Sequence, residues 1–343
     1  MTARVAPFGR LPGGRTIERF TIASGAIEAD VIPFGATLVA IRVPDLRGRP
    51  GDVVLGFDSI EPYLGPCGYM GAVVGRSANR IAQGRAVVAG REVRLTPNEP
   101  PHHLHGGAAG FDKKLWRVDG TTPSSVRFSL TSPDGDEGYP GRLEIRVTYE
   151  AIPGSGLRFD HEATCDRPTI VNPAQHAYFH LGDGGATVVA SHVLSIRSSL
   201  MTPADEAGIP TGEIASVEGT PYDFRTPAVL GPRIAAIGGG FDRNFVVADG
   251  ESGGLLPAAR LEDHSAGRRL EILTTRPGLQ LYTAGRFDGS LVGRGGARYR
   301  AFHGVALEAQ GFPDAPNHDR FPRTTIAAGE TASGSTVYRF SSG

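Results

Sequence analysis

Two histidines lie four residues apart in the segment 170–181, which reads IVNPAQHAYFHL. On a helix, His176 and His180 would share one face, the arrangement of the zinc-binding H-E-x-x-H motif. Tyr178 and Phe179 favour a strand instead, and the Asn-Pro pair upstream is a helix breaker. On a strand, one face would carry alternate residues: Asn172, Ala174, His176, Tyr178 and His180. The segment alone predicts a strand whose histidines are more often structural than catalytic.

A third histidine of interest, His105, lies in the segment NEPPHHLHGG, residues 98–107. Its neighbours His102 and His103 are expected to belong to a solvated polar loop. His105 precedes Gly106 and Gly107, where the backbone can bend sharply and come close to a ligand. Of these three histidines, His105 is therefore the best candidate for a functional site.

A metal site is one chemistry that these histidines could support. His105, His176 and His180 would supply three imidazole ligands. Ala177 stands where the zinc motif has the glutamate that activates water. We therefore rank a metalloenzyme below acid–base chemistry and expect no metal.

The most informative acid is Glu308, which follows the apolar run Val305-Ala306-Leu307. This run predicts a buried strand, and a buried carboxylate is costly unless it is paired or used. A second acid, Asp242, follows flexible glycines and lies between two aromatic residues in GGGFDRNF, residues 238–245.

Three arginines are threaded among small residues in VGRSANRIAQGR, residues 74–85: Arg76, Arg80 and Arg85. The guanidinium fork can hold vicinal hydroxyls or a carboxylate. In a chain so rich in arginine, one or two of the three are expected to be ordinary surface residues.

Composition excludes several classes of partner and enzyme. The 343 residues carry 35 Lys+Arg against 36 Asp+Glu, a formal net charge of −1, which argues against nucleic-acid or membrane partners. Two cysteines are too few for a cysteine zinc site. There is no G-x-S-x-G or P-loop motif, and no run approaches the ~20 apolar residues of a membrane span. The N-terminal residues lack the apolar core of a signal peptide, so we expect a cytoplasmic protein.

Strands rather than helices must position these candidates. Alternating apolar residues predict strands over SVRFSLT, LEIRVTY and LRFDHEATC, residues 125–131, 143–149 and 157–165. The turn-rich SPDGDEGYPG between the first two predicts an antiparallel hairpin with a long loop. Helical periodicity is scarce, and no change in composition marks a domain boundary. We predict one all-β domain over residues 1–343, a large antiparallel β-sandwich.

Six motifs together resemble the aldose 1-epimerase (galactose mutarotase) family: GRSANRI, HLHGG, NPAQHAYFHL, GFDRNF, PGLQLYT and LEAQGFPDAPN. They occur in the family's order and at comparable separations, and the similarity covers residues 20 to 340. The resemblance implies a β-sandwich enzyme that needs no cofactor. Its implied activity is the interconversion of the α and β anomers of free aldohexoses such as galactose or glucose.

The resemblance also implies a role for each matching residue. Glu308 would be the general base and His176 the general acid. The residues implied to position the sugar are Asn79, Arg80, His105, Asp242 and Gln280. The family commonly has asparagine in place of His180 and threonine in place of Ala309, so these two positions leave substrate preference open.

Acid–base ring opening explains why such residues are wanted. One group must remove the proton of the C1 hydroxyl while another protonates the ring oxygen, and each contributes roughly 10²–10⁴-fold. We expect kcat/KM to fall at low pH as Glu308 is protonated and at high pH as His176 loses its proton.

We expect the protein to be a monomer or weak homodimer. Two alternative functions remain. An epimerase of a phosphorylated hexose would need extra cations, which Arg76 or Arg85 could supply. A non-catalytic sugar-binding module could share the fold. Retention of both His176 and Glu308 favours the enzyme.

Overall fold

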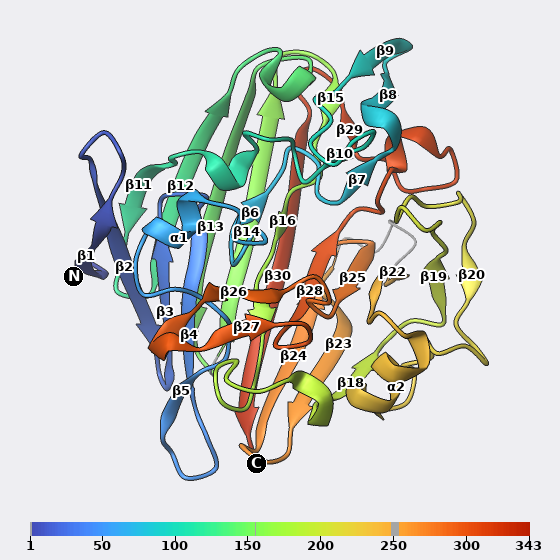
Figure 1. Ribbon diagram of the computed structural model, residues 1–343. Coiled ribbons are helices and arrows are strands. Elements are labelled where there is room, and N and C mark those ends of the chain that lie inside the picture. Colours follow the sequence, from blue (N-terminus) through green and yellow to red (C-terminus); the bar gives the residue numbers. More distant parts are fainter. Residues whose placement is uncertain (1, 155, 248–253) are drawn as a thin grey trace.

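The computed structural model describes residues 2–154, 156–247 and 254–343. Within these ranges antiparallel strands dominate, and they form sheets of nine, six and five strands with several two-stranded sheets (Figure 1). The predicted all-β, antiparallel architecture is confirmed.

The nine-stranded sheet runs through the middle of the molecule. In spatial order its strands are β11 (Arg117–Thr121), β12 (Ser125–Ser132), β13 (Leu143–Ile152), β14 (Gly156–Cys165), β30 (Thr331–Ser342), β24 (Arg268–Thr274), β23 (Leu256–Asp263), β18 (Val193–Ile196) and β21 (Ala228–Val229). The predicted hairpin is present, with β12 and β13 paired from Ser125 opposite Glu150 to Ser132 opposite Leu143. β30, the long red strand in Figure 1, lies between β14 and β24 and joins the two parts of the sheet.

Two smaller sheets complete the sandwich. The six-stranded sheet has the order β17 (Tyr178–Phe179), β28 (Val305–Gln310), β25 (Gly278–Tyr282), β22 (Asp242–Val246), β19 (Leu200–Thr202) and β20 (Ala215–Ser216). The five-stranded sheet consists of β1 (Arg4–Arg10), β2 (Thr16–Ser24), β3 (Ile27–Ile32), β4 (Thr37–Pro44) and β5 (Pro50–Asp52).

Short strand pairs and helices decorate these sheets. The pairs are β6 (Val73–Val74) with β16 (Ala174–Gln175), β7 (Arg80–Ile81) with β10 (His103–Leu104), β8 (Arg85–Val88) with β9 (Arg91–Arg94), β15 (Thr169–Ile170) with β29 (Thr325–Ile326), and β26 (Asp288–Val292) with β27 (Arg298–Arg300). The α-helices are α1 (Glu61–Leu64) and α2 (Leu230–Ile237). In the described ranges, neither has the length and apolar character needed to cross a membrane.

One hydrophobic core joins the three large sheets. Buried and less buried residues alternate along β13, so its apolar side chains other than Ile152 point inward. They belong to the same core cluster as Leu279 and Leu281 of β25 and Val305 and Leu307 of β28. A register shift of one residue would move the buried side chains of such a strand to the opposite face of the sheet, so burial fixes the register.

β28 is buried on both faces, and the alternation of its side chains sets the direction of Glu308. Val305, Leu307 and Ala309 belong to the main core. Since strand residues alternate, Glu308 must point to the opposite face of the six-stranded sheet. The core therefore holds that sheet rigidly by one face and leaves the other face to carry polar groups.

Candidate active site

A pocket of about 350 Å³ lies over the polar face of the six-stranded sheet. Six residues predicted for the site line it: Asn79, Arg80, His105, His176, Asp242 and Glu308. They come from β7, β22, β28 and the connections near β10 and β16, so segments distant in the sequence meet here. Gln280 does not line the pocket. It lies opposite Glu308 in the strand pairing and donates Nε2 to Asp242 Oδ1 at 2.6 Å, behind that carboxylate.

His176 lies where its segment changes sheet. β16 pairs with β6, whereas β17 pairs with β28, and His176 and Ala177 connect the two pairings. The backbone of His176 is fixed by hydrogen bonds to Gly71 and Ala72. His176 and Tyr178 line the pocket, whereas His180, at the far end of the segment, does not. The predicted single strand is in fact two short pairings that meet at His176 and Ala177.

His105 is fixed through both its backbone and its ring by Asn79. The His105 N–H donates to the Asn79 carbonyl at 3.0 Å, and the Asn79 N–H donates to His105 Nδ1 at 3.1 Å. Because Nδ1 accepts, the neutral ring carries its proton on Nε2 and offers a donor to the pocket. Gly106 is needed for a reason other than the predicted approach to a ligand: a Cβ there would lie 1.7 Å from the Gly75 carbonyl oxygen.

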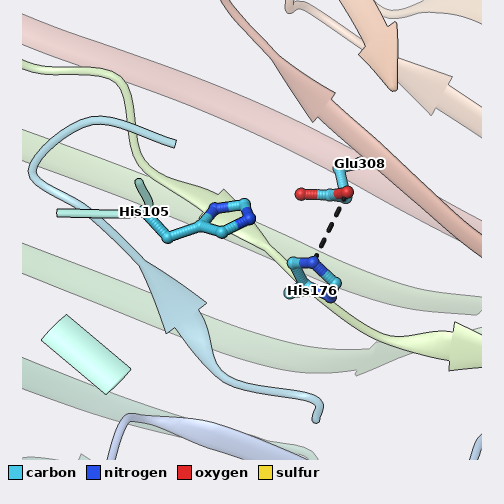
Figure 2. Close-up of side chains that lie close together, drawn as sticks. All are labelled: His105, His176 and Glu308. Atoms are coloured by element: carbon cyan, nitrogen blue, oxygen red, sulfur yellow. Dashed lines mark ion pairs between the residues drawn. The ribbon is translucent and has the colours of Figure 1, made fainter. Parts of the chain in front are cut away.

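A buried acid–base pair lies at the bottom of this pocket. Figure 2 shows the rings of His105 and His176 directed toward the Glu308 carboxylate, with His176 Nε2 3.6 Å from Glu308 Oε1. The three residues are only 6%, 3% and 2% exposed, respectively. Glu308 Oε2 and His176 Nδ1 have no hydrogen-bond partner in the described protein. Such unsatisfied buried atoms are typical of a site that completes its hydrogen bonds with a ligand.

Burial controls the protonation of this pair. It raises the pKa of Glu308 well above the usual range, with Asp242 adding to the rise and Arg80 opposing it. It lowers the pKa of His176 to about 4, and it lowers the pKa of His105 well below its ordinary value. The sequence assigned the acid limb of the pH profile to Glu308 and the basic limb to His176. These opposite shifts favour the reverse assignment.

The same three residues could offer ligand atoms to a metal, since these atoms lie within 4.8 Å of one another. The set differs from the predicted one, because Glu308 takes the place of His180. The hydrogen bond from Asn79 to Nδ1 puts the proton of His105 on Nε2, where a metal would require a lone pair. The residues therefore fit a metal poorly.

Charged side chains form a chain along one wall. Arg80 donates Nε to Glu99 Oε2 at 2.5 Å and NH2 to Glu99 Oε1 at 3.2 Å. Its NH1 lies 3.6 Å from Asp242 Oδ2. Arg286 donates NH1 to the same Glu99 Oε1 at 2.7 Å. One carboxylate thus holds two arginines of the pocket.

The two other arginines of the segment 74–85 lie outside the pocket. Arg76 is not a surface residue: it is 1% exposed, and its guanidinium donates to carbonyl and hydroxyl oxygens of Ser132, Pro133, Pro140 and Thr169. Arg85 is exposed, as expected for a surface arginine.

His102 and His103, the two histidines near His105, differ from each other in burial. His103 is fully buried, not solvated, because its nitrogens bond the Thr96 carbonyl and the Tyr139 hydroxyl, each at 2.7 Å. His102 is half-buried. Tyr139 is distant in sequence, so nothing local distinguishes His103 from His102.

Sequence reasoning missed the aromatic residues that pack against the rings of His105 and His176. Tyr69 lies 4.5 Å from His105 and 6.0 Å from His176 between ring centroids. Tyr178 packs 4.9 Å from His176 on the other side. Tyr69 has a φ of 58°, a strained conformation for an aromatic residue that is concentrated at functional sites. Its place just before the GRSANRI motif was the available signal.

Comparison with known proteins agrees with the motifs and the fold. A family model described as Aldose 1-epimerase matches residues 18–339. The chain is 43% identical to the galactose mutarotase of Bos taurus over 338 residues, 98% of each chain. It is 35% identical to the aldose 1-epimerase of Escherichia coli (strain K12) over 337 residues, 96% of each chain.

Solved structures give the same result. An aldose epimerase homologue from C. elegans aligns with a TM-score of 0.87 and 32% identity, over 95% of this chain and 99% of that one. The galactose 1-epimerase from Lactobacillus acidophilus NCFM aligns with a TM-score of 0.85 and 27% identity, over 100% and 99%. The resemblance carried by the six motifs is thereby confirmed, and the chain belongs to the aldose 1-epimerase family of isomerases.

Proposed function

We propose that the protein interconverts the α and β anomers of a neutral aldohexose, with Glu308 as general base and His176 as general acid. The observation that carries this proposal is the buried pair His176 Nε2–Glu308 Oε1, 3.6 Å apart, in a pocket that a sugar ring can enter. A pure sugar binder gains nothing from desolvating both a base and an acid, which costs stability.

The reaction needs one proton to leave and another to arrive. Glu308 removes the proton of the C1 hydroxyl while His176 protonates the ring oxygen. The bond between C1 and the ring oxygen then breaks and leaves an open-chain aldehyde. After rotation about C1–C2, the ring oxygen attacks the other face of the aldehyde. It returns its proton to His176, and the new C1 oxygen takes the proton from Glu308.

The pair must hold a single proton to do this work. Burial favours the arrangement with both groups neutral and the proton on Glu308, because it disfavours either charge. Moving this proton to His176 gives the reactive arrangement without changing the number of protons. Arg80 assists, because its charge lowers the pKa of Glu308. Activity then follows the singly protonated pair, whose titrations belong to both groups together.

The limbs of the pH profile follow from this count. At low pH the pair gains a second proton, so activity falls through the lower pKa, about 4 for His176. At high pH the pair loses its only proton, so activity falls through the raised pKa of Glu308.

The other polar residues of the pocket match the hydroxyls of a sugar. His105 presents a neutral Nε2–H donor, and Arg80 and Asn79 lie beside it. Asp242 offers acceptors, and its orientation is fixed by Gln280. We assign these residues to positioning the sugar so that C1 and the ring oxygen lie between the acid and the base.

Charge argues for a neutral sugar over a phosphorylated one. Among described residues, the pocket lining carries two cations, Arg80 and Arg286, both paired to Glu99, and three acids, Asp242, Asp288 and Glu308. Arg76 and Arg85 lie outside this lining, so they supply no charge for a phosphate in the pocket. A dianion would meet acids without free cations to balance it.

Polarimetry is the direct test. Crystalline α-D-galactose or α-D-glucose is dissolved, chelator-treated protein is added, and the optical rotation is followed to equilibrium. We expect relaxation faster than in buffer, in proportion to protein concentration. The absence of acceleration with both sugars would contradict the proposal, and acceleration that requires added metal would favour the metal site instead.

We further propose that the protein works in the cytoplasm as a monomer or weak homodimer. Cys67 and Cys165 are free, buried thiols, which suits a reducing compartment. Light scattering at several protein concentrations tests the oligomeric state.

A further inference from the structure

We propose that Glu99 makes the site selective against anionic sugars by occupying both arginines of the pocket. This inference rests on the proposed function and concerns its substrate class. It assigns a selectivity role to a residue that does not itself line the pocket.

The contacts of Glu99 are those of a shared counter-ion. Its Oε1 accepts from both Arg80 NH2 and Arg286 NH1, and its Oε2 accepts from Arg80 Nε. Burial alone would raise the pKa of Glu99, but the hydrogen bonds from the two arginines hold it below the usual range. The carboxylate is therefore charged at neutral pH, and both guanidinium groups donate to it.

The loop that carries Glu99 keeps it in place. Glu99 and His102 exchange two backbone hydrogen bonds, at 3.1 and 2.8 Å. The side chain of Asn98 bonds the backbone N–H and carbonyl of Leu104, at 2.7 and 2.9 Å. These bonds tie the loop to the segment that also holds His105, so the backbone of Glu99 is fixed beside the pocket.

The two arginines would otherwise make an anion site. Their guanidinium groups converge on one point, the Glu99 carboxylate, and a carboxylate is the group that an arginine fork recognises best. Arg80 is buried, whereas the side chain of Arg286 is 69% exposed at the mouth. With Glu99 present, a negatively charged sugar must compete with a fixed carboxylate that is already positioned. A neutral sugar meets no such competition.

The test compares a neutral sugar with its C6 carboxylate, D-galactose with D-galacturonate, by polarimetry of each α anomer. Glu99→Gln keeps the shape and removes the charge. We expect the ratio of kcat/KM for galacturonate over galactose to rise roughly tenfold, the size of one hydrogen bond to a charged group. The gain should shrink as salt is added. The ratio is the readout because releasing Arg80, which is assigned to positioning the sugar, changes the activity on galactose as well.

Two further variants control the experiment. Arg286→Gln leaves Glu99 on Arg80 and should not raise the ratio, and adding it to Glu99→Gln should remove much of the gain. Ser290→Arg places a new guanidinium at an exposed lining position, where folding is not at risk, and should raise the ratio. An unchanged ratio in folded Glu99→Gln overturns the proposal, and Ser290→Arg serves as the positive control for a free cation in the pocket.

The outcomes separate this inference from the proposed function. Wild-type protein that fails to accelerate galactose mutarotation contradicts the function itself. Wild-type protein that is active on galactose, with no rise in the ratio for Glu99→Gln, contradicts only the role of Glu99.

Discussion

Two buried clusters of histidine and carboxylate lie at either end of the segment HAYFH, and the histidines of only the first line the pocket described above. In the first, His105, His176 and Glu308 face a cavity. In the second, the rings of His180 and His192 lie 4.7 Å apart, and His192 Nδ1 is 3.6 Å from Asp263 Oδ2. Residue types and burial are nearly the same in the two clusters.

The difference lies in what the imidazoles bond. In the second cluster the backbone uses them: the Leu181 N–H donates to His192 Nε2 at 3.0 Å, and the N–H groups of Gly182 and Asp183 donate to His180 Nδ1. His180 Nε2 and His192 Nδ1 have no hydrogen-bond partner in the described protein, as is true of His176 Nδ1 in the first cluster, but neither His180 nor His192 lines the pocket. The second cluster therefore braces a loop, whereas the first leaves a proton donor and an acceptor open to a substrate.

The two carboxylates should give the largest contrast. Glu308→Gln should lower kcat/KM by roughly 10²–10⁴-fold, because it removes the base. Sugar binding by calorimetry should largely survive, and thermal stability should not fall, because a costly buried acid is gone. Asp263→Asn should leave activity near wild type but weaken the bonds from Ser265 and Ala266, lowering the free energy of unfolding by about 1–3 kcal/mol. Equal loss of binding and activity in Glu308→Gln would point to a structural role.

The two histidines of the motif should separate in the same way. His176→Asn should reduce kcat/KM by roughly 10²-fold or more, since it removes the acid. His180→Asn should retain activity because His180 lies outside the pocket, while urea unfolding should report a modest loss of stability. If His180→Asn were as inactive as His176→Asn, the division between the clusters would be wrong.

Asp242 tests the electrostatics of the pocket. Its charge raises the pKa of Glu308, so Asp242→Asn should lower that pKa. The basic limb of kcat/KM should then move to lower pH, because the pair loses its single proton earlier. Loss of a contact to the sugar should also raise KM. A basic limb that stays in place while KM rises would show that Asp242 only binds.

The second cluster should make the free energy of unfolding depend on pH in the acidic range. Burial lowers the pKa of His192 to about 4, whereas an unfolded histidine titrates near about 6.5. Between these values the unfolded state binds the extra proton, so stability falls as the pH falls through this window. His192→Gln lacks this titration and should lose about 2 kcal/mol less than wild type between pH 7.5 and pH 5. Urea unfolding at the two pH values measures the difference, and parallel losses would contradict it.

Local patterns were sufficient where a strand stays in one sheet. The alternation in residues 125–165 predicted β12, β13 and β14, and the apolar run before Glu308 predicted a buried strand. They failed where the chain changes partner. The alternation from Asn172 to His180 assumed one strand, but two pairings meet at His176.

Long-range contacts were beyond the reach of any local pattern. Glu99 and Arg286 are 187 residues apart, and neither side chain carries a signal for the other. His103 is buried where Tyr139, which is distant in sequence, bonds its ring. The reason for a glycine at position 106 was also hidden from the local sequence. A Cβ at Gly106 would collide with the Gly75 carbonyl, which lies about thirty residues earlier in the chain.

The position of β30 has a consequence for how the chain matures on the ribosome. β11 to β14 can pair as soon as they are made, but β14 then presents an unpaired edge until residues 331–342 arrive. Exposed edges of this kind promote aggregation. Nascent chains that stop before β30 should accordingly depend on chaperones, and the same residues that complete the sheet release the protein from that dependence.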